Sequence, residues 1–258
     1  MTPVRQYLAL SRRSIVNILR QPAAIVPAFV FPLLFLALTS ASLNRSIHLP
    51  GFPQVDSFLQ FGIATTIIQG ALFGAIAAGA NMASDIEHGF FERLVASPVS
   101  RTAILVGRVA GAAVLGFVQA LVFFGVTSLF GLNVESGLPG ILLVAIVAAV
   151  VSAGIGAVAV AFGLRTGSTE AVQGSFPLLF VLMFFSSAFF PRTLMEGWFK
   201  TVATYNPVSW LIEAARALVI EGLDVRDFLV ALAVAAGIFV VGNLLAGLAL
   251  RRRLAAGA

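Results

Sequence analysis

Long apolar runs separated by short polar segments make up most of this chain. Each run is close to the ~20 residues that an α-helix needs to cross the hydrocarbon core of a bilayer. The runs predict six transmembrane helices, at residues 24–43, 58–80, 102–131, 138–163, 173–190 and 228–250. We therefore expect an all-α polytopic membrane protein with a single transmembrane domain over residues 1–258, in which residues 251–258 form a tail after the last span.

A different pattern precedes the first span. Between residues 4 and 20, apolar residues at helical spacing share one arc and arginines share the adjacent arc, which is typical of a helix lying in the membrane interface. These arginines are Arg5, Arg12, Arg13 and Arg20. We expect residues 1–23 to form this interfacial helix. The alternative is the charged start of a signal peptide with a cleavage site near residues 40–42, but the apolar run that follows is long enough to span.

A short charged segment, residues 81–108, separates the second and third runs. Ser84 and Glu87 have the spacing of a capping box, and Pro98 should end the helix by Ser97, because proline disfavours helical geometry in the residue before it. Apolar and charged residues of this helix take opposite halves of a helical wheel. We expect the apolar flank to rest on lipid or on the protein itself, which leaves the charged flank for a partner.

The apolar segment that opens with Pro207, after Asn206, is shorter than a span. Asn206 suits the N-cap and proline suits the first helical turn. A helix over residues 207–220 would extend about 21 Å at 1.5 Å per residue, whereas the hydrocarbon core is about 30 Å thick. Glu213 and Arg216 stand three residues apart and are able to pair with each other. We expect two short helices over residues 190–225 that dip into the outer leaflet and return.

The placement of arginine and lysine predicts the orientation. Cytoplasmic segments of membrane proteins carry an excess of these residues. If both termini are cytoplasmic, eleven of the 16 basic residues fall inside and five outside. An even number of crossings agrees with this orientation, so we expect both termini and the charged segment on the cytoplasmic side.

Composition supports the membrane class and excludes several functions. Of the 258 residues, 59% are hydrophobic and 10% are charged, against roughly 45–50% and about 25% in soluble domains. The net charge of +5 comes from arginines that flank apolar runs, so no nucleic-acid partner is expected. Cysteine is absent and the two histidines stand far apart, so no metal site is expected.

The residues of an enzyme or of an ion-coupled carrier are missing. The chain has no G-x-x-x-x-G-K-[ST] loop, and no glycine-rich segment precedes its only lysine, Lys200. No Asp or Glu falls within the six predicted spans, whereas proton- and sodium-coupled carriers keep ionisable groups at membrane depth. We therefore expect no catalytic residues, no cofactor bound by this chain, and an energy source outside it.

Two motifs link this pattern to a known family. The charged segment reads D-x-x-x-G-x-x-E-R-L-x-x-x-P-V-S-R from Asp85 to Arg101, and the second motif is N-P-V-S from Asn206, followed by Glu213, Ala214 and Arg216. In length, span number and the placement of both motifs, the whole chain resembles the permease subunits of ABC-2-type exporters of the daunorubicin-resistance kind.

The resemblance implies a mechanism and a set of partners. The charged segment would be a coupling helix held in a cleft of an ATPase, and residues 1–23 would be a connecting helix beside it. The partners would be two copies of a separate ATP-binding subunit, which holds the ATP and magnesium, and a second permease chain, expected to form a homodimer in the bacterial cytoplasmic membrane. The residues expected to couple to the ATPase are Asp85, Glu87, Gly89, Phe90, Glu92, Arg93, Leu94, Pro98 and Arg101.

Two expectations remain open between alternatives. Glu87 falls on the apolar arc of the coupling segment, where it either completes the capping box or contacts the ATPase. Phe176, Phe180 and Phe184 in the fifth predicted span either line a cavity for flat apolar cargo or pack against lipid and neighbouring helices.

We expect export of hydrophobic or amphipathic compounds, drug-like or lipid-like. The alternatives are a polysaccharide or glycolipid export permease, a membrane scaffold or assembly factor that transports nothing, and a secondary carrier.

Overall fold

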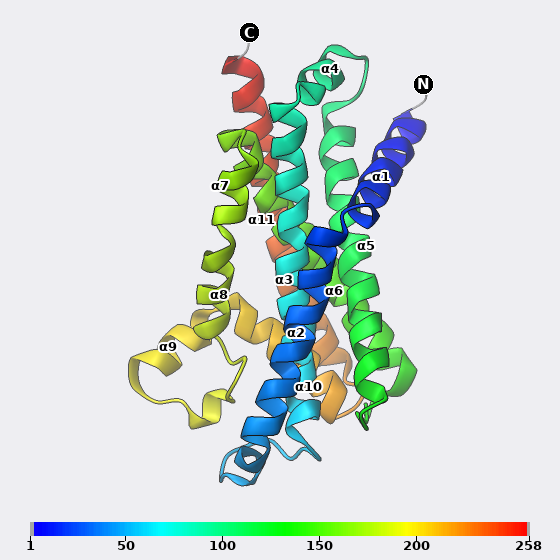
Figure 1. The fold of residues 1–258 in the computed structure, drawn as a ribbon. Coiled ribbons are helices and arrows are strands. Elements are labelled where there is room, and N and C mark those ends of the chain that lie inside the picture. Colours follow the sequence, from blue (N-terminus) through cyan, green and yellow to red (C-terminus); the bar gives the residue numbers. More distant parts are fainter. Residues whose placement is uncertain (1–2, 257–258) are drawn as a thin grey trace.

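The computed structural model describes residues 3–256, which form a bundle of helices without strands in this part of the chain (Figure 1). The elements in order are α1 (Pro3–Leu19), α2 (Pro22–Leu43), η1 (Asn44–His48), α3 (Phe58–Glu87), α4 (Phe90–Ala96), α5 (Arg101–Ser128), α6 (Gly137–Thr166), α7 (Thr169–Gly174), α8 (Phe176–Phe184), η2 (Arg192–Leu194), α9 (Gly197–Tyr205), α10 (Pro207–Ile220) and α11 (Val225–Ala256). The start of α1, the end of α11 and α4 lie at one end of the bundle, called the terminal end below (Figure 1). α9 and α10 lie toward the opposite end.

Among the described helices, five are long and apolar enough to cross a membrane: α2, α3, α5, α6 and α11. They correspond to five of the six predicted spans. The fifth predicted span, residues 173–190, is not one helix, because α7 ends at Gly174 and α8 begins at Phe176. Pro177 occupies the first turn of α8, where its missing N–H breaks no helical hydrogen bond. α7 and α8 stack end to end beside α3 and lead from the terminal end to α9 (Figure 1). The count of six crossings therefore stays a prediction.

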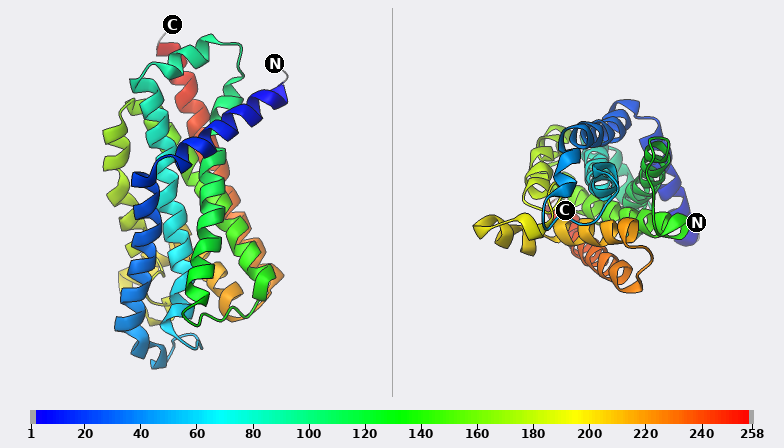
Figure 2. Two further views of the ribbon diagram at one scale, coloured as in Figure 1. Left: turned by 45° about the vertical axis from the view of Figure 1, so that its right-hand side comes forward. Right: turned by 90° about the horizontal axis from the view of Figure 1, so that it is seen from below.

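α3 is the central helix of the bundle. In its most apolar window 94% of the residues are buried inside the protein, against 17% in those of α2 and α11. It packs against α2, α5, α6, α7 and α10 (Figure 1 and Figure 2). It is also the least apolar of the five long helices, with a mean hydropathy of 1.7, because a helix surrounded by protein can carry polar residues that would be costly against lipid.

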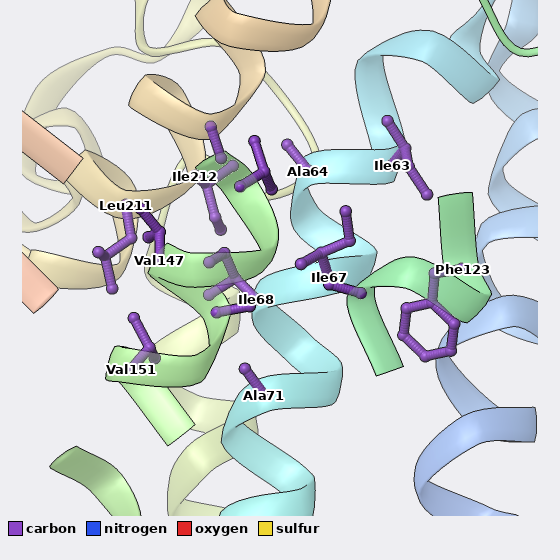
Figure 3. Close-up of a cluster of buried hydrophobic side chains, with 14 of the residues drawn as sticks. Ile63, Ala64, Ile67, Ile68, Ala71, Phe123, Val147, Val151, Leu211 and Ile212 are labelled. Atoms are coloured by element: carbon purple, nitrogen blue, oxygen red, sulfur yellow. The ribbon is translucent and has the colours of Figure 1, made fainter. Parts of the chain in front are cut away.

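The largest buried cluster surrounds the half of α3 toward the opposite end. Figure 3 shows Ile67 and Ile68 of α3 between Val147 of α6 and Phe123 of α5, with Leu211 of α10 nearby. Lipid tails are as apolar as these side chains, so close van der Waals packing holds helices together in a bilayer. The position of α10 beside α3 and α6 follows from this packing.

Glycines allow the closest contacts between helices, because they let two backbones approach each other. A Cβ atom added to Gly79 of α3 would collide with the backbone of Ala159 in α6. Gly154 of α6 and Gly242 of α11 face each other in the same way, each against the other helix's backbone. These positions fix how near α6 approaches its two neighbours.

The charged segment differs from the prediction at its start. α3 continues to Glu87, Gly89 adopts a left-handed conformation with φ +67°, and α4 is a separate helix. The predicted capping box does not form: the Ser84 side chain contacts His88, and the Glu87 carboxylate binds Thr169. The apolar pattern of α3 runs into this segment without a break, and glycine is the residue that readily reverses the chain there. The predicted end is right, since α4 ends at Ala96 before Pro98.

The predicted tail after the last span is mostly helical, because α11 continues to Ala256. Residues 257–258 of that tail and residues 1–2 of the predicted connecting helix lie outside the described residues.

The opposite end contains the two predicted short helices, α9 and α10. α10 begins and ends as predicted, and the Asn206 side chain accepts a hydrogen bond of 2.9 Å from the Val208 N–H as its N-cap. α9 projects from the side of the bundle (Figure 2).

The predicted pair between Glu213 and Arg216 is wrong. Glu213 binds Arg192, with 2.7 Å between Arg192 Nε and Glu213 Oε1. Arg216 instead points into the bundle, where it donates to the carbonyls of Phe61 and Ser187. The segment from Ser187 to Arg192 at the start of η2 supplies partners for both residues, which spacing along one helix does not reveal.

Candidate functional site

The terminal end is organised around the carboxylate of Asp85, near the end of α3. Arg13 of α1 binds it with both terminal nitrogens, at 3.1 Å to Oδ2 and 3.0 Å to Oδ1. Arg108 of α5 forms a second ion pair with the same carboxylate. The Asp85 and Arg108 side chains are 12% and 6% exposed, so this cluster is largely shielded from solvent. One carboxylate therefore ties three helices together.

The start of α1 is fixed to the turn between α4 and α5. Gln6 donates to the Pro98 carbonyl at 2.9 Å and accepts from the Ser100 N–H at 3.1 Å. The Tyr7 hydroxyl lies 2.7 Å from Thr102 Oγ1. Hydrogen bonds from Thr102 and then Ser100 lower the pKa of Tyr7. A displacement of this turn would thus act directly on α1.

The second half of α1 packs closely on α5. A Cβ atom on Gly107 would collide with Leu10, and one on Gly111 would collide with Ser14. Ser14 is buried and donates to the carbonyl of Arg108 at 3.2 Å. Figure 2 shows α1 crossing obliquely over α5 at this point. The contact has no space for larger residues on α5.

The four arginines of the predicted connecting helix differ in their surroundings. Arg5, Arg12 and Arg20 are exposed, which suits the predicted contact with headgroups. Arg13 is half-buried against Asp85, and burial lowers the pKa of its guanidinium. This arginine is a structural partner of α3. The sequence pattern did not distinguish it from the other three arginines, because all four lie on one arc of the helix.

α4 has one buried flank and one exposed flank. Phe91 is buried, and Leu94 packs against the same cluster. Glu92 and Arg93 are exposed on the other flank. Glu92 lies 3.8 Å from Arg253 of α11, and Arg93 donates back to the Gly89 carbonyl. The helix is thus held by its apolar side and displays charge away from the bundle.

The other predicted coupling residues surround α4. The Arg13 guanidinium stacks 3.9 Å above the centroid of the Phe90 ring, which is a close cation–π geometry. Pro98 and Arg101 are exposed after α4, so they join Glu92 on the accessible surface. Asp85 does not, because its arginine partners surround it.

Glu87 binds Thr169, a contact that belongs to neither of its two predicted roles, the capping box and the contact with the ATPase. Its carboxylate accepts from the Thr169 N–H at 2.7 Å and from the Thr169 hydroxyl at 2.8 Å. Both bonds join the end of α3 to the start of α7. The two residues stand 82 positions apart, so no local pattern indicates the contact.

Some of the predicted cargo phenylalanines line a cavity of about 510 Å³ between α2, α3 and α8. Phe176 and Phe180 line it, together with Phe31 of α2 and Phe73 of α3. Phe184 is absent from its wall and is 51% exposed. The structure thus brings two of the three predicted residues together and adds two that sequence reasoning missed.

One missed residue had a signal in the sequence. Arg108 lies within the predicted third span, and an ionisable residue at such a position generally has a partner inside the protein. Gln6, Tyr7 and Thr169 had no such signal, because each contacts a residue far away in the chain.

Comparison with known proteins identifies the family of this bundle. A sequence model described as "ABC-2 type transporter" matches residues 5–220. The chain belongs to the ABC-2 type transporter family. The match extends through α10 and leaves α11 outside it.

Three relatives with similar sequences are named as permeases. The chain is 28% identical to a daunorubicin resistance ABC transporter permease protein of Streptomyces coeruleorubidus, over 85% of this chain and 77% of the relative. It is 26% identical to a probable doxorubicin resistance ABC transporter permease protein of Mycobacterium tuberculosis, over 92% and 85%. A putative transport permease of Porphyra purpurea is 27% identical over 83% and 73%.

Together with the five apolar helices, these matches make the chain a multi-pass membrane protein and a transporter permease subunit. The resemblance inferred from the two motifs is therefore confirmed at the level of the family.

Proposed function

We propose that this ABC-2 permease forms the membrane-spanning part of an ATP-driven exporter of hydrophobic or amphipathic compounds, drug-like or lipid-like. A separate ATP-binding subunit supplies the energy. The names of two relatives, resistance permeases for daunorubicin and doxorubicin, support this class of cargo. The aromatic cavity between α2, α3 and α8 supports it independently, since it offers apolar surface within the bundle.

The exposed flank of α4 carries the proposal. Glu92 and Arg93 project from a short helix whose other flank is anchored by buried Phe91. A partner that holds Glu92 and Arg93 can push or pull the end of α3 as a rigid unit. Pro98 and Arg101 extend the same accessible surface. We assign this surface to the ATP-binding subunit.

Asp85 then acts as a positioning residue inside the permease. It joins the end of α3, just before α4, to α1 through Arg13 and to α5 through Arg108. α1 leads directly into α2, a wall of the aromatic cavity. A force on α4 would therefore reach the cavity through the end of α3, the Asp85–Arg13 ion pair and the chain connection from α1 to α2.

The assembly follows from the same assignment. Two permease chains, identical to each other, would pair with two ATP-binding subunits that hold ATP and magnesium. Both termini and α4 would face the cytoplasm, since the ATP-binding subunits are there. The location would be a bacterial cytoplasmic membrane.

The test is a charge reversal on the exposed flank of α4. The double variant Glu92→Lys, Arg93→Glu is expected to insert and fold normally but to lose at least tenfold of the cargo-stimulated ATPase activity in the reconstituted complex. Glu170→Lys is the matched control, because Glu170 is an exposed acidic residue of α7 near the same end. It should keep full activity.

Three results would count against the proposal. Unchanged ATPase activity in the double variant would remove α4 from the coupling route. Purification from native membranes without a nucleotide-hydrolysing subunit would favour a scaffold, and transport that follows a proton gradient without ATP would favour a secondary carrier.

A further inference from the structure

The cavity of about 510 Å³ lies behind the elbow between α1 and α2. The elbow includes Gln21, whose amide donates to Asn81 of α3 at 2.9 Å. Small residues of α3 face this region at helical spacing, at Gly74, Ala77 and Ala80. Because these side chains are short, α3 leaves a gap that α2 does not fill. Its volume lies within the roughly 300–1,000 Å³ of small-molecule sites.

Four phenylalanine rings form one wall of this gap. Phe73 lies 4.6 Å from Phe176 and 4.8 Å from Phe180, measured between ring centroids. Phe31 meets Phe180 edge to face at 5.7 Å. Such rings favour another aromatic ring over an aliphatic chain, because edge-to-face and offset contacts add attraction beyond the buried area.

Polar groups occur at only one rim. Gln21 and Gln173 line the side toward the terminal end, and no Asp, Glu, Lys or Arg is among the lining residues that the structure describes. A charged group of a ligand would therefore lose its hydration without gaining a counter-ion. An uncharged group that forms hydrogen bonds would meet the amides of the two glutamines.

A polar bond keeps α2 in place over the gap. Pro32 has no N–H to donate to the Ala28 carbonyl one turn earlier, and Gln119 of α5 donates to that carbonyl instead, at 2.6 Å. The amide oxygen of Gln119 is buried without a partner, which costs free energy. Because Gln119 holds α2 in place despite this free-energy cost, we expect the cavity to stay open and α2 not to close onto α3.

We infer that this cavity, formed within a single chain, binds one planar, uncharged aromatic compound by its ring system, with a hydrogen-bonding group of the ligand at the Gln21–Gln173 rim. The inference rests on the proposed function in so far as this ligand is the exported compound. The binding itself needs neither ATP nor a second permease chain.

The probe is 1-pyrenecarboxamide, added to the full chain in lipid nanodiscs without nucleotide. The chain has two tryptophans, so Trp198→Phe and Trp210→Phe remove the background emission. Phe180→Trp then places a donor in the aromatic wall, and energy transfer to pyrene should saturate as the cavity fills. Phe239→Trp on exposed α11 is the control and should show only the transfer that rises linearly with pyrene dissolved in lipid.

A filling variant tests the location. Ala77→Phe, combined with the Phe180→Trp reporter, should weaken the saturable binding at least tenfold. Val158→Phe adds the same ring to an exposed position of α6 outside the cavity wall and should leave it unchanged. Saturable transfer that is equal for the Phe180→Trp and Phe239→Trp reporters, or that survives Ala77→Phe, would overturn the inference.

Competitors test the ligand class at equal membrane-bound concentration. Dodecanamide has the same amide on an aliphatic chain, and 1-naphthoate has the rings of 1-naphthamide with a charge. Each should compete at least tenfold less well than unlabelled 1-naphthamide. If dodecanamide competes equally, the occupant is a lipid chain; if the carboxylate does, the ligand is not uncharged. Either result overturns the assignment.

The outcomes for binding and for export are distinct. If saturable pyrene binding survives Ala77→Phe while the assembled complex exports a drug-like compound with ATP, the inference fails and the proposed function stands. If binding saturates as expected but no ATP-dependent export occurs in the assembled complex, the proposed function fails and the site remains a binding site.

Discussion

The carboxylate of Asp85 forms ion pairs with two arginines at the terminal end. It balances Arg13, which is partly exposed, and Arg108, which is 6% exposed. Breaking a buried ion pair from one side is costly because it leaves the other charge desolvated and unpaired. Here the removal of one carboxylate would leave two facing guanidiniums. The charged segment thus contains residues of two kinds: Glu92 and Arg93 face outward, and Asp85 holds the helices behind them.

We predict that Asp85→Asn destabilises the protein by about 3 kcal/mol, the lower end of the range for breaking a buried ion pair. The asparagine keeps the shape of the side chain, so the loss reports the charge. Thermal unfolding in lipid nanodiscs would measure it. Asp56→Asn, at an exposed aspartate outside the predicted spans, is the control and should change stability by less than about 0.5 kcal/mol. Equal effects of the two variants would contradict the role of Asp85.

At the scale of elements, the contact between α1 and α5 decides whether α1 moves with the bundle. Gly107 and Gly111 allow the backbone of α1 to touch α5, and Gln6 fixes its first turn to the end of the α4–α5 loop. In lipid such contacts depend on complementary packing. A larger residue would separate the helices, and the Arg13–Asp85 bond would lengthen with them.

Gly107→Leu is therefore expected to displace α1 and to lower the unfolding temperature, even though leucine has a better intrinsic helix propensity than glycine by roughly 0.8 kcal/mol. Gly125→Leu in the same helix is the matched control, because nothing lies within 4 Å of a Cβ atom there. It should be neutral or slightly stabilising. Thermal unfolding and limited proteolysis at the α1–α2 elbow would distinguish the two, and proteolysis that is unchanged in Gly107→Leu would contradict the packing argument.

At the scale of the whole molecule, the two ends of the bundle have different architecture. The terminal end contains α4, the start of α1, the end of α11 and the Asp85 cluster, and the opposite end contains α9 and α10 (Figure 1). The segment α7–α8 passes between the two ends although neither helix is long enough to span alone. The even number of crossings that places both termini on one side depends on this broken segment.

The natural absence of cysteine allows a direct test of this topology. Ala255→Cys on α11 and Thr201→Cys on α9 are both exposed positions. In intact cells a membrane-impermeant thiol reagent should label the cysteine at position 201 and leave the one at position 255 unlabelled until the cells are permeabilised. Labelling of the cysteine at position 255 but not the one at position 201 in intact cells would contradict this topology, because it is the pattern expected if α7–α8 does not cross.

Local sequence determines much of this protein. The bounds of α10 follow from Asn206, Pro207 and the short apolar run, since caps and proline act within one turn. The five long helices follow from apolar length alone, because a bilayer admits few alternatives to helix. The family followed from two motifs, each read within one short segment.

The tertiary structure decided the partners of the polar groups and the shape of the cavity. Asp85 meets Arg13 across 72 positions, Gln119 holds the Ala28 carbonyl across 91, and Arg216 reaches Phe61 across 155. Helical periodicity specifies which face a residue occupies, but only the packing of helices against each other sets which faces meet. For that reason the sequence predicted a charged coupling segment and an aromatic span, and the fold determined which charges are free and which rings surround a cavity.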